Sequence, residues 1–388
     1  MSKWRKKQLQ EIAFLKPTET LKKGDIAPNI PMANIKEFQR DVVKIDYGEF
    51  RGGTKFRNGD TLLAKITPCL ENGKTAFVNC LQEDEIGFGS TEFIVLRAKE
   101  NIDERFLYYL SISPEFRKQA ISLMEGTSGR KRVNENALKI SDFLIPDFEE
   151  QRKIANILSA IDDKIQINNQ INQEFEAMAK TLYDYWFVQF DFPDQNGKPY
   201  KSSGGKMVYN PELKREIPEG WGVEKLSHFL TIKNGKDHKH LQDGKFAVYG
   251  SGGIMRTVTD YLYSGESILF PRKGTLNNVM YVNEKFWTVD TMFYSEVNKN
   301  NSALYVFYSV KDIDFNKLNT GTGVPSMTSS ILYDLSIIVP EENILEKFNT
   351  IVKRNYETIK LNNIQNQELT QLRDWLLPML MNGQVKVE

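Results

Sequence analysis

Two stretches of the chain carry apolar side chains at alternating intervals of three and four residues, the pattern of helices that pair with one another. The first stretch runs from Arg152 to Trp186, and the second occupies the last part of the chain. The predicted packing positions are Leu158, Ile161, Ile165, Asn168, Asn172, Phe175 and Leu182 in the first, and Ile359, Asn362, Asn366, Leu369 and Leu376 in the second. Each stripe is too narrow to stabilise one helix alone, so we expect an antiparallel coiled coil.

Amide side chains interrupt both stripes in the middle, at Asn168, Asn172, Asn362 and Asn366. Buried asparagines lower the stability of a coiled coil but fix its register, because a slipped pairing leaves the amides without partners. The alternative is that the helices splay apart here and that water solvates the amides. A helix of about 35 residues is about 50 Å long at a rise of about 1.5 Å per residue, so a pair of them is predicted to space two domains.

The remaining pattern consists of short β-branched and aromatic runs with a few helical segments. Residues 1–147 contain TLLAKIT, TAFV and EFIVL around the helical ERFLYYLSISPEFRKQAISL. Residues 221–340 repeat this order with KFAVYG, SILFP, NVMYV and TMFYSEV, followed by the helical SALYVFYSV. The predicted fold class is therefore α+β, with two similar, mixed and β-rich domains separated by the long helices.

A constant offset of 194 residues relates many positions of the two halves, for example Gly323 to Gly129 and Pro340 to Pro146. The offset equals half of the 388 residues, which indicates one duplicated unit and an internal pseudo-two-fold axis. The predicted organisation is a domain at 1–147, a helix at 148–190, a connection at 191–220, a domain at 221–340 and a helix at 341–388. Because residues 191–220 are rich in Gly, Pro, Ser and Lys, we expect a mobile surface connection there.

Composition places the chain among soluble proteins, which we expect to be cytoplasmic and without a membrane partner. Hydrophobic residues make up 40%, yet no long apolar run occurs, and MSKWRKKQLQ at the start lacks the apolar segment of a signal peptide. The formal net charge is zero, with a small basic excess in the two domains and a small acidic excess in the helices. Cys69 and Cys80 lack the companions of a zinc site, so we expect two free thiols and no bound metal.

Catalytic motifs are incomplete wherever part of one occurs. Gly73-Lys74-Thr75 resembles the end of a phosphate-binding loop, but Pro68 stands where the first glycine is needed. Asp162-Asp163-Lys164 resembles part of a nuclease site, but neighbouring carboxylates on a helix diverge and cannot share one metal. Dinucleotide-binding and nucleophile-elbow patterns are also missing, so we predict no catalytic residue and favour a binding function.

Both halves contain Gly-rich loops with basic, hydroxyl or amide side chains, a combination suited to phosphates and base edges. The candidate DNA-binding residues of the first half are Arg51, Lys55, Arg57, Thr127, Ser128, Arg130, Lys131 and Arg132. Those of the second half are Lys236, His238, Lys239, Ser251, Arg272, Lys273, Asn277, Thr320 and Thr322. For any single basic residue, a solvated surface position is the alternative. The GTSG and TGTG loops recur at equivalent places, which favours them over the rest.

The segment LIPDFEEQRKIANILSAIDDK, with LSIIVPEENILEKF and LRDWLLPMLMNGQV in the second half, resembles the specificity subunits of type I restriction-modification enzymes. The most diagnostic part is the Pro146-x-x-Glu149-Glu150-Gln151 motif that opens the first long helix, with Ile154 following. The second copy has Leu345 where Gln151 stands in the first, a local departure from this motif. The resemblance extends over essentially the whole chain.

The resemblance implies a non-catalytic subunit whose two target-recognition domains each read one half of a bipartite, double-stranded DNA sequence. It implies two modification subunits that use S-adenosylmethionine, two restriction subunits that use ATP and Mg²⁺, and no cofactor in this chain. On this basis, the candidate residues of each domain contact one half-site. The outer helix faces near Glu149, Glu150, Arg152 and Lys153 are candidates for docking the modification subunits, with solvated surface as the alternative.

Two other classes of function remain as alternatives. A fused restriction-methyltransferase or a nuclease would need a cofactor-binding glycine motif and an Asn/Asp-Pro-Pro-aromatic tetrapeptide, and the sequence contains neither. A coiled-coil adaptor that binds only proteins would not bind DNA selectively. Binding that is selective and depends on a modification subunit distinguishes the recognition subunit from both.

Overall fold

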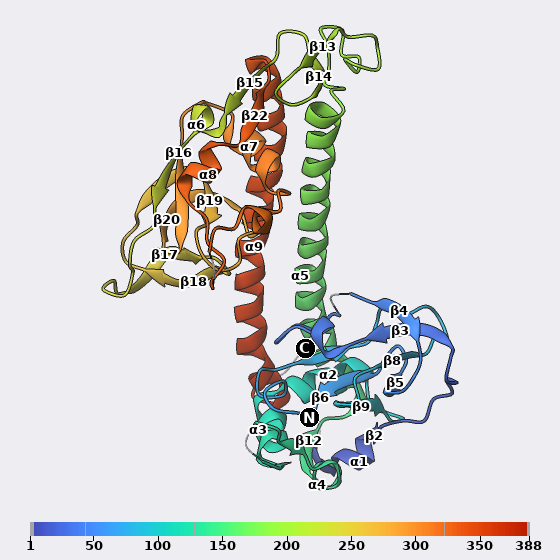
Figure 1. Ribbon diagram of the computed structural model, residues 1–388. Coiled ribbons are helices and arrows are strands. Elements are labelled where there is room, and N and C mark those ends of the chain that lie inside the picture. Colours follow the sequence, from blue (N-terminus) through green and yellow to red (C-terminus); the bar gives the residue numbers. More distant parts are fainter. Residues whose placement is uncertain (1–3, 43, 128, 322, 386–388) are drawn as a thin grey trace. The chain divides into compact units, whose positions relative to one another are not determined.

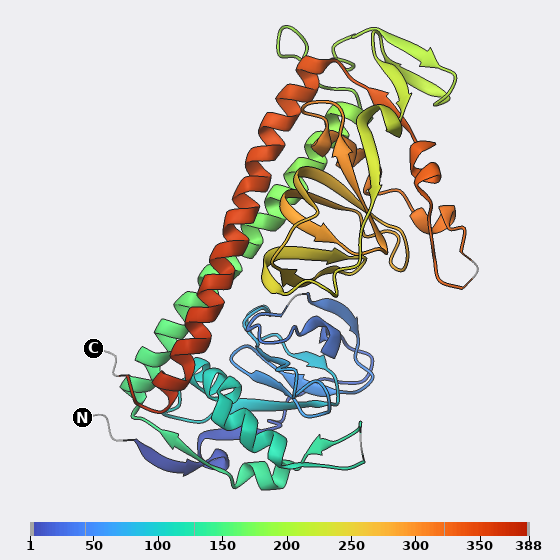
Figure 2. The ribbon, with the colours of Figure 1, turned by 90° about the vertical axis from the view of Figure 1, so that its left-hand side faces the viewer.

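The computed structural model describes residues 4–42, 44–127, 129–321 and 323–385 (Figures 1 and 2). Two compact units are present: unit 1 comprises Met1–Gln170 and Asn362–Glu388, and unit 2 comprises Ile171–Leu361. Each of the two long helices contributes one section to each unit. Each unit therefore consists of an α+β domain together with one section of each long helix.

Unit 1 contains two four-stranded sheets, with strand orders β2-β9-β6-β7 and β4-β3-β8-β5, and the separate pairs β1-β12 and β10-β11. Its strands are β1 (Arg5–Gln8), β2 (Ala13–Leu15), β3 (Ile26–Ile30), β4 (Asp46–Glu49), β5 (Thr54–Phe56), β6 (Thr61–Ala64), β7 (Thr75–Phe77), β8 (Gly87–Gly89), β9 (Phe93–Ala98), β10 (Met124–Glu125), β11 (Arg132–Val133) and β12 (Asp142–Ile145). Its helices are α1 (Leu9–Ile12), η1 (Met32–Asn34), α2 (Glu104–Ile112), α3 (Pro114–Ser122), α4 (Glu135–Lys139), the first part of α5 (Phe148–Tyr183) and the last part of α9 (Glu342–Met381).

Capping side chains define where the helices of unit 1 begin. Asp103 accepts hydrogen bonds from the backbone N–H groups of Arg105 and Phe106 at the start of α2. Asp147 accepts one from the N–H of Glu150, so α5 starts directly after the Pro146-Asp147 pair. Caps of this kind satisfy donors that the first helical turn leaves without partners.

Unit 2 contains one six-stranded sheet of order β16-β21-β19-β20-β17-β18 and the pairs β13-β14 and β15-β22. Its strands are β13 (Met207–Asn210), β14 (Arg215–Pro218), β15 (Gly222–Lys225), β16 (Leu230–Asn234), β17 (Asp243–Gly250), β18 (Gly253–Val258), β19 (Tyr263–Pro271), β20 (Met280–Thr288), β21 (Met292–Val297) and β22 (Ser336–Val339). Its helical elements are the last part of α5, η2 (Asp184–Val188), α6 (Leu226–Phe229), α7 (Ala303–Val310), η3 (Phe315–Leu318), α8 (Ser329–Tyr333) and the first part of α9 (Glu342–Met381).

The two units share one strand topology. The parallel pair β3-β8 of unit 1 corresponds to β17-β20 of unit 2, and the antiparallel hairpin β3-β4 corresponds to β17-β18. The long strand β19 pairs with both β20 and β21, as the successive strands β5 and β6 pair with β8 and β9. Asn101 and Asn301 even share a positive φ, of 63° and 60°, at equivalent turns before α2 and α7. The repeat seen in the sequence is therefore a repeat of the fold.

In unit 1, polar side chains join the long helices. Arg373 of α9 donates to Asp162 of α5 at 2.9 Å, and both side chains are nearly fully buried. Six residues further along α5, the amide of Asn168 donates to the side-chain oxygens of Gln365 and Asn366, at 2.8 and 2.9 Å. Residue numbers fall along α9 as they rise along α5, so these helix sections run antiparallel.

In unit 2, aromatic side chains join the same two helices. Phe348 of α9 is fully buried, and its ring lies against Tyr183, Trp186 and Phe187 at centroid distances of 6.4, 6.2 and 5.0 Å. Phe187 also contacts Tyr305 of α7, at 4.6 Å. The helix sections of unit 2 thus belong to the main hydrophobic core of that unit.

The segment 191–220 has more structure than its composition suggests. It contains the β13-β14 hairpin, in which Met207 pairs with Pro218 and Asn210 with Arg215. Phe192 stacks on Trp221 and on Tyr200, both at 4.7 Å. Gly and Ser had suggested a mobile connection, but aromatic packing and strand pairing fix this segment onto unit 2.

None of the helices formed by the described residues has an apolar stretch that could cross a membrane.

Candidate nucleic-acid interface

Backbone hydrogen bonds bring two loops of unit 1 together. The N–H of Thr67 donates to the carbonyl of Lys131 at 3.0 Å, and the N–H of Val133 donates to the carbonyl of Lys65 at 2.9 Å. The loop after β6 is thereby fixed to the GTSGRKR loop between β10 and β11. The same part of unit 1 includes Glu92, because the N–H of Lys65 donates to the carbonyl of Glu92.

The corresponding loops of unit 2 are joined in the same way. The N–H of Gly274 donates to the carbonyl of Pro325 at 3.0 Å, and the N–H of Met327 donates to the carbonyl of Arg272 at 2.9 Å. The PRKGTLNN and TGTGVPS loops thus meet as their counterparts do in unit 1. Side chains in these loops differ between the units while the backbone connection between the loops is retained.

An asparagine side chain adds a third segment to each group of loops. In unit 2, the amide of Asn278 donates to the carbonyl of Ser251 at 2.8 Å, which fixes the turn between β17 and β18. In unit 1, the amide of Asn72 donates to Glu37, in the connection between β3 and β4, at 3.0 Å. In each unit, the connection between the two hairpin strands therefore lies beside the two loops that are joined by backbone hydrogen bonds.

The basic residues of the unit 1 loop have different environments. Arg130 and Lys131 are exposed and form no side-chain hydrogen bond or ion pair with a described residue. Arg132 instead forms two parallel hydrogen bonds to Glu92, the shortest at 2.7 Å, and this guanidinium lowers the pKa of the Glu92 carboxyl. Thr127 is exposed, whereas Ser128 lies outside the described residues.

The other candidates of unit 1 lie around β5, and they too have partners within the unit. The ammonium group of Lys55 donates to the carbonyls of Glu19 and Leu21, at 3.0 and 3.1 Å. Arg51 pairs with Glu49 at 2.8 Å, and Arg57 remains exposed. Lys55 thus has an internal role that its sequence context did not reveal.

The candidates of unit 2 are distributed over the joined loops and their neighbours. Lys236, Lys239 and Lys273 are exposed, while His238 and Ser251 are half-buried. The half-buried guanidinium of Arg272 lies over the Phe293 ring at 5.9 Å and donates to the carbonyl of Asp290 at 3.5 Å.

Two further candidates of this unit have hydrogen bonds within it. Asn277 donates to Asp314 at 3.1 Å, and Thr320 is bonded through its hydroxyl to the carbonyl of Ser326 at 3.3 Å. Thr322 lies outside the described residues.

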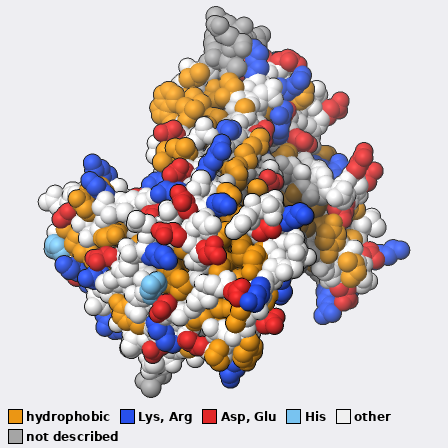
Figure 3. All heavy atoms as spheres, turned by 90° about the horizontal axis from the view of Figure 1, so that it is seen from above, with side chains coloured by type: hydrophobic (Ala, Val, Ile, Leu, Met, Phe, Trp, Pro, Cys, Tyr) orange, Lys and Arg blue, Asp and Glu red, His pale blue; other side chains and the backbone are white. Residues whose placement is uncertain are grey.

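Electrostatics alone do not define a binding face. Lys and Arg side chains are interspersed with Asp and Glu on the face that Figure 3 displays. The described residues contain no group of three His, Cys, Asp or Glu side chains that could hold a metal ion. Cys69 and Cys80 are free and half-buried.

The predicted helix-packing positions differ in burial. Leu158, Ile161, Asn168 and Asn172 are buried. The half-buried positions are Ile165, Phe175, Leu182, Ile359, Asn362, Asn366, Leu369 and Leu376. Of the predicted outer-face residues, Glu149, Arg152 and Lys153 are exposed and Glu150 is half-buried, and Arg152 pairs with Glu149 at 3.6 Å.

Charged residues that sequence reasoning missed hold unit 1 to its helices. Arg40, in the connection between β3 and β4, pairs with Asp163 of α5 at 2.7 Å and is 5% exposed. Burial lowers the pKa of Arg373, but Asp162 and Asp374 more than offset this and raise it above its ordinary value. The sequence indicated such a contact only through the charge of Arg373 within an apolar stripe. Its partner could not be identified, because Asp162 is distant in sequence.

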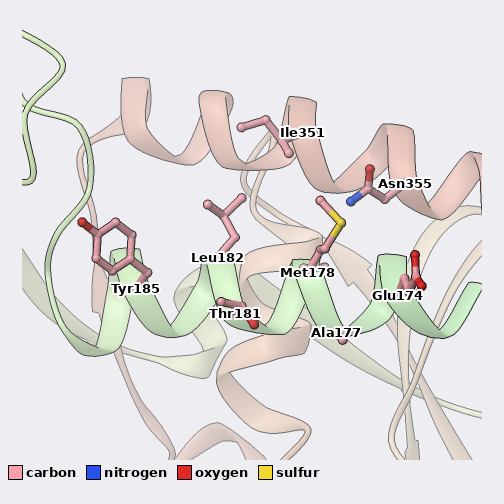
Figure 4. A pocket seen from close by; sticks show the side chains of 9 residues that line it. Glu174, Ala177, Met178, Thr181, Leu182, Tyr185, Ile351 and Asn355 are labelled. Carbon is pink, nitrogen blue, oxygen red and sulfur yellow. The ribbon is translucent and has the colours of Figure 1, made fainter. Parts of the chain in front are cut away.

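An apolar groove lies between the helices in unit 2 (Figure 4). Met178 and Tyr185 of α5 and Ile351 of α9 line it, with exposed fractions of 59%, 37% and 45%. Its only charged lining residue among those described is Glu174. Exposed apolar surface of this kind is typical of protein–protein contacts.

Comparison with known proteins identifies the family. The sequence model described as "Type I restriction modification DNA specificity domain" matches residues 1–177 and 218–371. The MjaIX specificity subunit of Methanocaldococcus jannaschii is 30% identical over 319 residues, which cover 75% of this chain and 71% of that protein. The HindI specificity subunit of Haemophilus influenzae is 25% identical over 405 residues, covering 85% and 87%.

A solved structure shows the same fold. The type I S subunit from M. genitalium superposes with a TM-score of 0.58 at 18% identity, covering 98% of this chain and 96% of that one. The chain therefore belongs to the specificity subunits of type I restriction-modification systems, which are DNA-recognition subunits without catalytic activity. The resemblance stated from the sequence is confirmed.

Proposed function

We propose that each unit reads one half of a bipartite DNA target through its joined loops. The observation that carries this proposal is the repeated backbone connection, which places loops with exposed basic side chains at equivalent positions of two folds with the same topology. Phosphate contacts position a protein on DNA, and contacts to base edges provide selectivity. Different side chains on equivalent loops then give an asymmetric pair of half-sites.

The helix pair sets the separation of the half-sites in this proposal. The 3/4 spacing of apolar positions, the antiparallel contacts within each unit and the amide bonds of Asn168 support a coiled coil with one fixed register. Half-sites one duplex turn apart have centres about 34–36 Å from one another, which is shorter than helices of this length.

Modification subunits dock on the helix pair, and restriction subunits join the assembly through them. The apolar groove near Met178 and Ile351 supports this contact, because a partner would cover side chains that water now surrounds. S-adenosylmethionine, ATP and Mg²⁺ are bound by those partners, and the specificity subunit supplies none of the chemistry.

Sequencing of DNA methylation in cells that carry the system tests the proposal. With the chain present, adenine methylation is expected at one bipartite sequence, and deletion of the chain is expected to abolish it. Exchanging residues 124–133 for the loop of another specificity subunit should alter one half-site only. A change in both half-sites would contradict reading by separate units.

A further inference from the structure

The hairpin between β17 and β18 carries two apolar side chains that are largely exposed. Ile254 and Met255 are 63% and 60% exposed, directly after the turn that contains Ser251. The strand register shifts here: Val248 pairs with Arg256 but Tyr249 pairs with Ile254, so Met255 is an extra residue in a β-bulge. A bulge redirects a side chain out of the regular alternation of a strand.

The backbone of this hairpin is held from two sides. Asn278 donates to the carbonyl of Ser251, and a Cβ atom on Gly274 would lie only 2.9 Å from the Ser251 hydroxyl. On the other side, Tyr249 donates to Glu284 at 3.0 Å, and Glu284 pairs with Lys360 of α9 at 2.9 Å. Ile254 and Met255 therefore lie on a hairpin whose position is fixed by these contacts.

The surroundings of the pair indicate what covers it. Arg272 and Lys273 lie in the loop that Gly274 and Asn278 fix against the turn. Cationic side chains beside a small apolar surface suit a polyanion that also displays apolar groups. Duplex DNA meets this description, because the methyl group of each thymine projects into the major groove between the phosphate backbones. The helix groove, whose one charged lining residue is acidic, has the character expected for a protein partner instead.

We infer that Ile254 and Met255 contact the 5-methyl group of a thymine in the half-site that unit 2 reads. This inference rests on the proposed function and adds the chemistry of one contact. Removing a methyl group from the apolar contact should weaken binding about fourfold, the equivalent of one buried CH₂ group. The contact distinguishes thymine from cytosine, which lacks the methyl group.

The test uses the full chain bound to its modification subunit and a duplex with the sequence methylated in cells. Each thymine of both half-sites is replaced in turn by deoxyuridine, which lacks only the methyl group, and the Kd is measured. At one position we expect about fourfold weaker binding. In the double variant Ile254→Ala, Met255→Ala, the same replacement should have no further effect.

A matched control is Ile26→Ala on β3, the counterpart of β17. Ile26 is 70% exposed but pairs with Glu49, at the end of the hairpin away from its connection. This variant should retain the thymine preference. Hydrogen exchange of β17 and β20 shows whether the double variant keeps its fold.

Two results would overturn the inference alone: selective binding without any thymine preference, or a preference that persists in the double variant. Loss of the modification subunit from the double variant would make the hairpin a protein contact and would also reject the inference. If the parent complex binds every duplex equally, the proposed function fails and the inference fails with it.

Discussion

Units 1 and 2 have the same strand topology and the same loop connections, but they hold their helices by different chemistry. In unit 1, the helix contacts include the buried Asp162–Arg373 pair and the amide of Asn168. In unit 2, the contacts are aromatic and centre on Phe348. Backbone hydrogen bonds depend little on side-chain identity, so a duplicated fold can keep its frame while its cores diverge.

The hairpin connections differ as well. In unit 1, the long connection between β3 and β4 reaches the helices through Arg40 and Asp163. In unit 2, the equivalent connection is a short turn with Ile254 exposed beside it. The connection in unit 1 thus contacts the helices of its own unit, whereas the turn in unit 2 leaves its apolar side chain exposed.

The largest effect is expected from Phe348→Ala in unit 2. Removing a fully buried ring leaves a cavity and should lower the free energy of unfolding by about 3–5 kcal/mol. Hydrogen exchange with mass spectrometry should show faster exchange in residues 171–361. Ile351→Ala, on the exposed face of the same helix, is the control. Equal effects of the two variants would show that the aromatic cluster does not support this unit.

Arg373→Ala should produce a loss of similar size in unit 1. It leaves the carboxylate of Asp162 buried without its cation, and breaking such a pair costs about 3–5 kcal/mol. Denaturant unfolding measures this loss. The double variant Asp162→Leu, Arg373→Met should recover much of it, because no unpaired charge remains. If the double variant is no more stable than Arg373→Ala, the unpaired charge is not the cause.

Arg40→Ala should release the unit 1 connection from the helices. Hydrogen bonds to charged groups contribute about 1.5–3 kcal/mol, so we expect a loss in this range. Exchange of residues 31–42 should accelerate. Arg51→Ala, which removes an exposed ion pair, should leave that exchange unchanged. Unchanged exchange in Arg40→Ala would argue against a supporting role for this contact.

The smallest expected effect distinguishes two neighbouring arginines. Arg130→Ala should weaken DNA binding about tenfold if Arg130 contacts DNA, because its guanidinium has no competing partner among the described residues. Arg132→Ala should weaken binding less, since Glu92 already engages Arg132. Titrations of the complex with the methylated sequence compare them. A larger effect of Arg132→Ala would show that this pair opens on binding.

The duplication and the long helices could be predicted from local patterns in the sequence. The 3/4 spacing predicted a helix from Arg152 to Trp186, and the structure has α5 from Phe148 to Tyr183 followed by η2 to Val188. Gln151 and Leu345 illustrate divergence at one repeated position: Gln151 bonds the N–H of Asp103, whereas Leu345 lies in the core of unit 2.

Contacts between distant residues were beyond the reach of a single sequence. The pairing of Lys55 with the carbonyls of Glu19 and Leu21, and of Arg132 with Glu92, depends on loops that meet only in the fold. The role of Asn278 could not be predicted either, because its partner is a backbone carbonyl. Which of the candidate residues touch DNA remains a prediction.

The chain of bonds from Lys360 through Glu284 to Tyr249 has a mechanical consequence. Turning α9 about its axis would separate the Lys360 ammonium from Glu284, the carboxylate that accepts the Tyr249 hydrogen bond, while β17 would keep its pairing with β18 and β20. A protein that binds α9 and displaces Lys360 would therefore change the stability of the β17-β18 hairpin. The affinity for DNA and the affinity for a protein bound to this helix would then be linked, each changing the other by the same factor.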